Sequence, residues 1–452
     1  MLRLRDTATG RVAELVPRDA GRTGLYVCGP TVYGAPHVGH GRFALVYDVL
    51  RRYLEFCGLR VDHVSNVTDI DDKIIDRAAS EGRSWRDVAA EAEAEWWAAM
   101  DQMGLARPTA TPHATEYIAE MVEFVGELRA RGSAYETGDG VYFDTSSVAD
   151  YGFLKHQSIE SLRAGARVEV DDQKRSPVDF ALWKRSKPGE PSWEAPFGAG
   201  RPGWHTECVV MSLALLGENF DLHGGGEDLI FPHHENERAQ AEARGKRFAH
   251  RWMHNGLVRV DGEKMSKSLG NFRTMADLLE RSDPRAYRLL VLGSHYRQAV
   301  EVNERTLEDA TTALGRIDSL ARRFADAPPD AEAGDAGEER RQFREAMDND
   351  LDTPRALGGL FSAMRRANAF WDAGDLRAGG TLARTVLDLF AALGVEAAGG
   401  RQEVDERVLD LVRRRDEARA ARDFAAADRL RAEIEQSGWV VEDTSGGTRV
   451  YR

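Results

Sequence analysis

Near the start of the chain a strand, a loop, a helix and a second strand follow one another within residues 24–67. The apolar strand G-L-Y-V-C-G (24–29) leads through the loop P-T-V-Y-G-A-P-H-V-G-H (30–40) into an apolar-periodic helix, which Gly58 ends. The next strand is R-V-D-H-V-S-N-V (60–67). Two strands joined by a helix form a βαβ unit with a right-handed crossover. The sequence therefore predicts an α/β domain with a parallel sheet.

The same alternation resumes after Trp204. D-L-H-G-G-G (221–226) predicts a strand, residues 232–244 predict a helix, and N-G-L-V-R-V-D-G continues the pattern. Between these two parts, residues 108–200 are irregular, with several Gly, Pro and Trp interruptions. The middle of the chain is therefore predicted to be an insertion that splits one parallel α/β domain.

From about residue 284 the pattern becomes helical. An acidic segment with proline and glycine, residues 326–338, predicts a linker or long loop. A helical hairpin over 404–437 and the ending W-V-V-E-D-T-S-G-G-T-R-V-Y-R complete the chain. We expect a Rossmann-like domain over 1–283, a helical bundle domain over 284–399 and a small α+β domain over 400–452.

Composition limits the possible compartments and partners. No apolar run approaches the roughly 20 residues that a membrane helix needs, and the N-terminus does not resemble a secretory signal. With only three cysteines, a disulfide scaffold is excluded and a reducing compartment is favoured. We therefore expect a cytoplasmic protein without membrane contact.

The net charge limits the possible partners. The formal net charge of -14 disfavours a protein that coats nucleic acid indiscriminately. It does not exclude a nucleic-acid partner bound by local basic strips.

The stretch I-F-P-H-H-E-N-E (230–237) allows two interpretations. Pro232 suits a first helical position, and the following residues are good helix formers, so a helix is predicted here. His233 and Glu237 are four apart and share one face of that helix. They can bind one metal ion or make a weak surface pair, and a zinc site would need further ligands from elsewhere.

Two further segments carry residues suited to phosphate chemistry. H-V-G-H (37–40) lies where the first strand meets its helix, and a helix N-terminus offers free N–H groups to phosphate. Gly39 would let a nucleotide approach the backbone. In D-G-E-K-M-S-K-S-L-G-N, Lys264 and Lys267 stand three apart, although only eight of the 61 basic residues are lysine. Two ammonium groups on such a loop suit the stabilisation of phosphoryl charge.

Other nucleotide and hydrolase motifs are not supported. G-A-G-R-P-G (198–203) has the G-x-G-x-x-G spacing but follows W-E-A-P-F rather than an apolar strand. The chain has no Walker A sequence and no G-x-S-x-G elbow, so H-G-G-G (223–226) is not expected to form a hydrolase oxyanion loop.

H-V-G-H and K-M-S-K-S resemble the two signatures of class I aminoacyl-tRNA synthetases. The longer phrases Y-V-C-G-P-T-V-Y, N-V-T-D-I-D-D-K-I-I, P-G-W-H-T-E-C and F-D-L-H-G-G-G-E-D-L-I-F-P-H-H-E-N-E resemble the cysteinyl-tRNA synthetase family. The similarity runs from about residue 2 to 297, and the ending is similar too. One difference is the valine in H-V-G-H, where the family usually has isoleucine.

The resemblance implies a set of site residues. One zinc ion per chain would be held by Cys28, Cys208, His233 and Glu237. His37, His40, Lys264 and Lys267 would be catalytic, and ATP would bind to His37, Gly39, His40 and Lys267. Thr68, Trp204, His223 and Asp228 would line the substrate pocket. Cys57 would remain as a buried apolar filler.

The implied activity is the ATP-dependent joining of L-cysteine to the 3′ end of tRNA-Cys by a monomer, with Mg²⁺ accompanying ATP. Zinc would separate cysteine from serine because a thiolate is a good zinc ligand and a hydroxyl is a poor one. Residues 400–452 would then be an anticodon-binding domain, and Trp439, Tyr451 and several arginines would suit RNA contact. Two alternatives stay open: a ligase that joins cysteine to an amino sugar, as in mycothiol synthesis, and a non-catalytic RNA-binding paralogue.

Overall fold

The computed structural model describes residues 1–157, 173–260, 263–264, 274–325, 327, 337–398, 405–444 and 447–451. Contacts divide the chain into two compact units, one formed by Met1–Ile317 with Pro328–Ala397 and the other by Asp318–Ala327 with Ala398–Arg452. Among the described residues, none of the helices combines the length and apolarity that crossing a bilayer requires.

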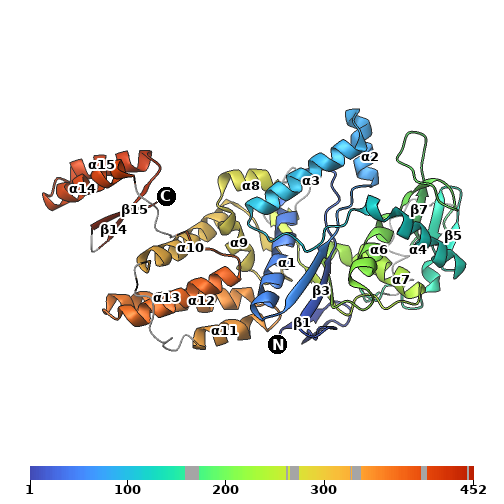
Figure 1. The fold of residues 1–452 in the computed structure, drawn as a ribbon, viewed down its shortest axis with the longest axis horizontal. Helices are drawn as coiled ribbons and strands as arrows, with labels where there is room; N and C mark the ends of the chain where they lie inside the picture. Colours follow the sequence, from blue (N-terminus) through green and yellow to red (C-terminus); the bar gives the residue numbers. More distant parts are fainter. Residues whose placement is uncertain are drawn as a thin grey trace. The chain divides into compact units, whose positions relative to one another are not determined.

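A four-stranded parallel sheet lies at the centre of the first unit (Figure 1). Its strand order is β10-β9-β3-β4, with the bounds β3 (Arg22–Val27), β4 (Arg60–Ser65), β9 (Leu222–Gly226) and β10 (Trp252–Asn255). Helix α1 (Val38–Phe56) connects β3 to β4, as the βαβ pattern predicted. The carboxyl ends of parallel strands meet at one edge of the sheet, which is where open α/β sheets bind ligands.

The insertion forms its own antiparallel sheet, in the order β5-β6-β7-β8. The bounds are α4 (Ile118–Ala130), β5 (Ala134–Glu136), β6 (Gly140–Phe143), β7 (Phe180–Arg185) and β8 (Gly200–Pro202). The G-A-G-R-P-G segment therefore contributes an antiparallel strand rather than a dinucleotide turn. Buried residues of this sheet, of α4 and of α6 (Trp204–Leu216) join one continuous core, which includes Trp183, Phe124 and Val209.

The regular helix α7 spans Glu235–Ala243 and follows the irregular turn Ile230–His234, in which only Phe231 is non-helical (φ -143°, ψ 131°). Helical backbone therefore begins at Pro232, directly after an extended residue, as the sequence predicted. One prediction about the strands of this half was wrong. The strand that joins the parallel sheet is β10, formed by W-M-H-N, whereas β11 (Val258–Val260) belongs to a small sheet with β12 (Glu263–Lys264) and β13 (Val300–Glu301).

The remaining elements of the first unit are peripheral or helical. They are β1 (Arg3–Asp6), β2 (Arg11–Glu14), α2 (Asp72–Glu81), α3 (Trp85–Gln102), α8 (Met275–Arg281), α9 (Pro284–Leu292), α11 (Gly337–Met347), α12 (Thr353–Asp372) and α13 (Leu376–Ala392). Helix α10 (Glu304–Arg323) begins in this unit, and its residues from Asp318 onward belong to the other unit. The described residues between 284 and 398 are thus mainly helical, as predicted. Most of the expected linker over 326–338 lies outside the described residues.

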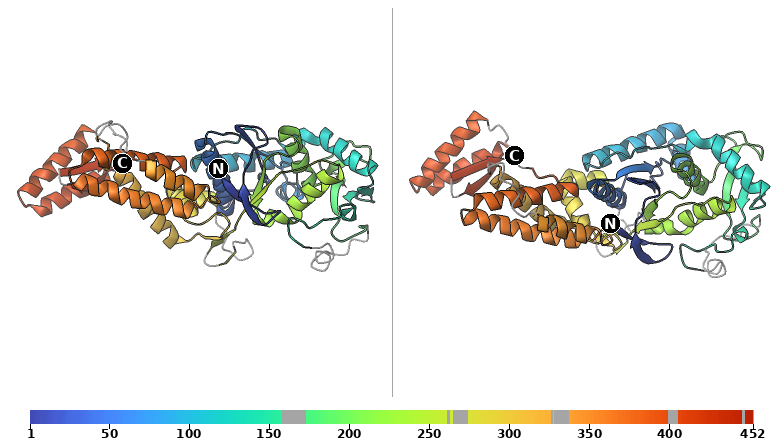
Figure 2. Two further views of the ribbon diagram at one scale, coloured as in Figure 1. Left: turned by 90° about the horizontal axis from the view of Figure 1, so that it is seen from below. Right: turned by 60° about the horizontal axis from the view of Figure 1, so that its bottom comes forward.

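The C-terminal unit contains a helical hairpin and a strand hairpin, as the sequence predicted. Its elements are α14 (Glu406–Ala420), α15 (Phe424–Gln436), β14 (Val440–Thr444) and β15 (Gly447–Tyr451), which Figure 2 shows packed together. It has a small apolar core of its own, which contains Leu411, Ile434 and Trp439. Trp439 is only 4% exposed, so the prediction that its ring meets RNA bases was wrong.

The expected place of Cys57 was also wrong. This cysteine is exposed at the carboxyl end of α1, where Gly58 follows in a left-handed conformation (φ 87°). The helix ends at this point, so Cys57 lies outside its buried face, although Tyr53 and Leu54 in the last turn are buried.

Candidate functional site

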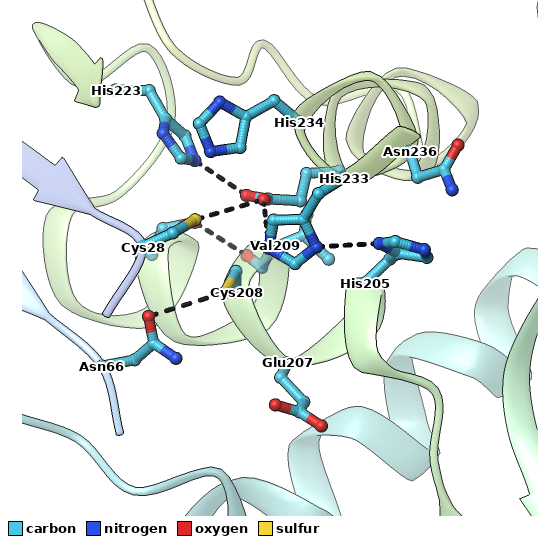
Figure 3. Close-up of polar contacts among 12 residues, drawn as sticks. Cys28, Asn66, His205, Glu207, Cys208, Val209, His223, His233, His234 and Asn236 are labelled. Carbon is cyan, nitrogen blue, oxygen red and sulfur yellow. Dashed lines mark hydrogen bonds and ion pairs between the residues drawn. The ribbon is translucent and has the colours of Figure 1, made fainter. Parts of the chain in front are cut away.

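Four side chains from separate parts of the chain converge at the carboxyl edge of the parallel sheet (Figure 3). Cys28 directly follows β3, Cys208 lies on α6, His233 lies in the irregular turn and Glu237 lies in the first turn of α7. One ligand atom from each lies within 4.8 Å of every other, and all four residues are buried. We refer to these four residues as the metal-ligand cluster.

The internal distances of the cluster suit a single ion. His233 Nε2 lies 3.0 Å from Glu237 Oε1, and Cys28 Sγ lies 3.4 Å from the same oxygen. Two sulfurs, one imidazole nitrogen and one carboxylate oxygen are ligand types that zinc accepts. Burial raises the pKa of the Cys28 and Cys208 thiols and lowers that of His233 well below its ordinary value. A cation at the centre would favour the thiolates, because a coordinating thiol is deprotonated outright.

Outer hydrogen bonds orient the imidazole and the carboxylate. His205 Nδ1 lies 2.8 Å from His233 Nδ1, which leaves His233 Nε2 directed at the cluster. His223 Nε2 lies 2.7 Å from Glu237 Oε2, the oxygen on the other side of that carboxylate. Such outer partners fix the orientation of metal ligands.

A second donor set shares half of the cluster. This set also has one ligand atom from each residue within 4.8 Å of every other, and it consists of Cys28, His223, His234 and Glu237. His234 Nδ1 is 2.7 Å from His254 Nε2, and His254 Nδ1 is 2.7 Å from Thr7 Oγ1. Because both sets use Cys28 and Glu237, one ion would occupy one set or the other.

The predicted pocket residues differ in exposure. Trp204 is 37% exposed and stacks on His233, with ring centroids 4.1 Å apart. His223 and Thr68 are buried, and Asp228 is exposed in a short turn after β9. His223 thus lies beside the metal-ligand cluster, and the partly exposed Trp204 packs on one of its members.

The two histidines of H-V-G-H cap helix α1. The backbone N–H of His40 donates to His37 Nδ1, and the backbone N–H of His37 donates to His40 Nδ1, each at 3.3 Å. The rings stack with centroids 3.6 Å apart. Burial lowers the pKa of His40 to about 3, with a further contribution from His37. Because Nδ1 accepts in both rings, the proton of each neutral imidazole is on Nε2.

Residues on the carboxyl side of the K-M-S-K-S segment lie against this cap. Thr274, which follows the segment, pairs with His37 as an isolated β-bridge, and Met275 N donates to Pro36 O at 2.8 Å. Gly41 packs against Met275, since a Cβ at this glycine would lie 2.4 Å from the Met275 sulfur. Lys264 lies in β12, and Lys267 lies outside the described residues.

Several polar residues around the cluster were not predicted from the sequence. They are Asn66, His205, Glu207, His234 and His254, all buried except for the partly exposed His205. Burial raises the pKa of the Glu207 carboxyl, and a hydrogen bond from Thr68 opposes this rise. The sequence offered one clue, because three of these residues are neighbours of predicted site residues. Asn66 is two residues from Thr68, Glu207 is next to Cys208, and His234 is next to His233.

Comparisons with known proteins cover nearly the whole chain. The family model "tRNA synthetases class I (C) catalytic domain" matches residues 14–312, "DALR domain" matches 342–397, and "Cysteinyl-tRNA ligase anticodon binding domain" matches 401–451. The cysteine–tRNA ligase of Carboxydothermus hydrogenoformans is 43% identical, with 100% of both chains covered. That of Clavibacter sepedonicus is 46% identical, with 99% of this chain and 98% of the relative covered.

Among solved structures, the chain is similar to Mycobacterium tuberculosis methionyl-tRNA synthetase in complex with methionyl-adenylate. The TM-score is 0.66 at 16% identity, and the match covers 90% of this chain and 96% of that one. At this identity the likeness concerns the fold alone.

Proposed function

The chain belongs to the cysteine–tRNA ligase family of class I aminoacyl-tRNA synthetases, and we propose that its metal-ligand cluster holds one zinc ion that selects the thiolate of L-cysteine. The protein is an enzyme that uses ATP to attach cysteine to tRNA-Cys. The observation that carries the zinc proposal is the convergence of four buried donors within 4.8 Å beside the partly exposed Trp204.

Zinc would supply a soft Lewis-acid centre, which deprotonates a thiol that binds to it and coordinates a neutral hydroxyl poorly. The chain itself excludes water around this centre, because all four ligand residues are buried. Trp204, stacked on His233, forms the accessible wall against which the amino acid would lie. We assign Thr68, His223 and Asp228 to the rest of the substrate pocket.

We assign ATP binding to the N-terminus of α1. His37 and His40 present Nε2–H groups as hydrogen-bond donors, which suit phosphate oxygens, and the helix N-terminus adds its own positive field. Gly39 lies between them and lets the nucleotide approach the backbone. Lys264 and Lys267 would neutralise phosphoryl charge in the transition state, with Mg²⁺ bound to ATP.

The reaction then has two steps. The cysteine carboxylate attacks the α-phosphate of ATP, which gives cysteinyl-adenylate and pyrophosphate, and the acyl group passes to the tRNA 3′ end. We propose that residues 1–283 perform this chemistry, that 284–399 form the helical domain, and that 400–452 bind the anticodon. A cytoplasmic monomer is proposed as well, and the free thiols of Cys28, Cys57 and Cys208 suit a reducing compartment.

Aminoacylation of tRNA-Cys by the purified zinc-loaded protein tests this function against its rivals. We expect ATP-dependent charging with cysteine and almost none with serine. Cysteine-dependent ATP–pyrophosphate exchange without tRNA charging, but with transfer to an amino sugar, would indicate the mycothiol-type ligase. Binding of tRNA without exchange would indicate a non-catalytic paralogue.

A further inference from the structure

A recess lies between α1, α3 and the parallel sheet (Figure 1). Its volume is about 480 Å³ with the space at its mouth included, which is within the size range of small-molecule sites. Its walls include Phe43 of α1 and Trp96, Trp97 and Met100 of α3. Among the described residues that line it, none belongs to the metal-ligand cluster, to the capping histidines of α1 or to the assigned substrate pocket. The recess is therefore a cavity that the proposed function does not use.

Strand pairing places His63 on the side of the sheet that α1 covers. Val27 of β3 lies in register with Ser65 of β4, and His63 is two residues earlier on the same strand. Alternation along a strand therefore puts these three side chains on one face, and all three line the recess. Tyr26 has the opposite orientation and belongs to the core that contains Cys28. The recess and that core are thus on opposite faces of the sheet.

The imidazole of His63 faces the recess without a hydrogen bond. The residue is only 7% exposed, and neither ring nitrogen has a partner among the described residues. Thr109 holds its backbone, because Thr109 N donates to His63 O at 2.7 Å, so the ring stays on this face. Burial lowers the pKa of His63 to about 3, with a further contribution from Arg51. The neutral ring offers one N–H donor and one acceptor nitrogen, and buried groups of this kind normally have partners.

The walls of the recess favour a flat aromatic ligand. Trp96 and Met100 are 5% and 3% exposed, and Phe43 and Trp97 add two more aromatic rings. Aromatic ligands pack well on such rings, edge-to-face or in offset stacks, and a methionine sulfur near a ring is favourable. A ring held between these walls and β4 lies beside His63, so a polar substituent on it can reach the imidazole.

The charges at the recess favour an uncharged ligand. Asp48 and Arg107 are the charged residues among those described that line it, and both have partners. The Asp48 carboxylate lies 2.6 Å from Arg288 Nη1 and 2.8 Å from Arg52 Nε. Arg107 makes a two-point contact with Asp101. A charged ligand would therefore lose its hydration here without gaining an unpaired counter-charge.

We propose that this recess is a second ligand site, which takes a small uncharged planar aromatic molecule whose hydroxyl bonds to His63. A phenol is the simplest compound of this class. The hydroxyl donates to the acceptor nitrogen of the imidazole, and the ring replaces solvent between the aromatic walls. The site acts independently of the metal-ligand cluster.

The site is close to the α1 cap but does not include it. Trp96 lines the recess and also contacts His40 edge-to-face, with ring centroids 5.4 Å apart. A ligand in the recess would therefore be separated from the proposed ATP site by one side chain. Competition with ATP distinguishes binding in the recess from binding in the ATP site.

The test compares 4-fluorophenol with 4-fluorotoluene, two rings of similar shape of which only the phenol has a hydroxyl. Binding of each to the full chain is measured by fluorine NMR relaxation. We expect 4-fluorophenol to bind with a Kd of about 1 mM or tighter, as is reasonable for so small a ligand. It should bind about 5- to 10-fold more tightly than 4-fluorotoluene, the scale of one net hydrogen bond. Saturating ATP should displace neither compound.

Three substitutions to leucine make the result decisive. His63→Leu removes both ring nitrogens, so the preference for the phenol should disappear. Ala44→Leu adds bulk to the α1 wall of the recess and should weaken binding of both compounds about 10-fold or more, even if His63→Leu does not fold. Ala98→Leu is the matched control, because Ala98 is exposed on α3 and does not line the recess. It should leave both affinities unchanged.

Four results would overturn the proposal. An unchanged preference for the phenol in His63→Leu would show that the hydroxyl bonds elsewhere. Equal binding in Ala44→Leu and the wild type would place both compounds outside the recess, and displacement by ATP would place them in the ATP site. Binding of neither compound to the wild type would leave water as the partner of His63.

Discussion

Replacing Cys208 with serine is expected to remove both the metal and the activation of cysteine. A neutral serine hydroxyl is a poor zinc ligand, and Cys208 is 1% exposed, so solvent offers no easy replacement. Changes to outer partners alone cost about 10- to 100-fold in metal affinity, and loss of a ligand should cost at least that much. Cysteine-dependent ATP–pyrophosphate exchange should fall by about 10³-fold or more, since coordination carries the selection. Zinc content and exchange are measured on the same preparation.

His234→Asn is the matched control for this experiment. His234 is a buried member of the second donor set and bonds to His254, but it lies outside the metal-ligand cluster. This variant should keep one zinc ion per chain. The reverse pattern, with metal kept in Cys208→Ser and lost in His234→Asn, would show that the second donor set is the true site.

Removal of residues 401–452 is expected to separate the two half-reactions. The C-terminal unit has its own apolar core around Leu411, Ile434 and Trp439. The metal-ligand cluster and the α1 cap lie in the other unit. Exchange of ATP and pyrophosphate should therefore stay within about twofold of the full chain, while tRNA charging should fall by about 10³-fold or more, comparable to the ratio between specific and non-specific nucleic-acid binding.

The surface of this C-terminal unit suits RNA. Phe424 is 62% exposed at the start of α15, and the side chains of Arg413 and Arg414 on α14 are 70% and 56% exposed. Exposed aromatic rings and arginines are the groups that stack on and pair with single-stranded bases. A parallel loss of exchange, charging and thermal stability in the truncated protein would show instead that the segment only stabilises the rest.

The fold was predictable where local patterns agreed with the tertiary structure. The segment 24–67 shows the order strand, helix, strand that a βαβ unit requires, and the structure has β3, α1 and β4 there. The second half was harder because its strands are short and buried. W-M-H-N gives no alternating pattern, since all four residues are buried, so the neighbouring β11 was taken for the sheet strand. The extended conformation of Phe231 has a local cause, because a residue that precedes proline is disfavoured in the helical region.

The site was predictable only in part from residue spacing. His233 and Glu237 are four residues apart, but Cys28 and Cys208 come from other elements, and only the family resemblance connected them. Their proximity depends on the pairing of β3 with β9 and on the position of α6, which no local pattern encodes. The predicted exposure of Trp439 and the predicted burial of Cys57 were wrong for a related reason. The burial of a side chain depends on which face of its helix or strand meets the core.

In the proposed function the substrate sulfur binds directly to the metal held by the cluster. Cobalt(II) can replace zinc as a visible probe, because thiolate–cobalt charge-transfer absorption increases with the number of bound thiolates. With Cys28 and Cys208 as protein ligands, L-cysteine should raise this absorption by about half as the bound thiolates increase from two to three, and L-serine should leave it unchanged. An unchanged spectrum at saturating L-cysteine, or an equal response to L-serine, would contradict the claim.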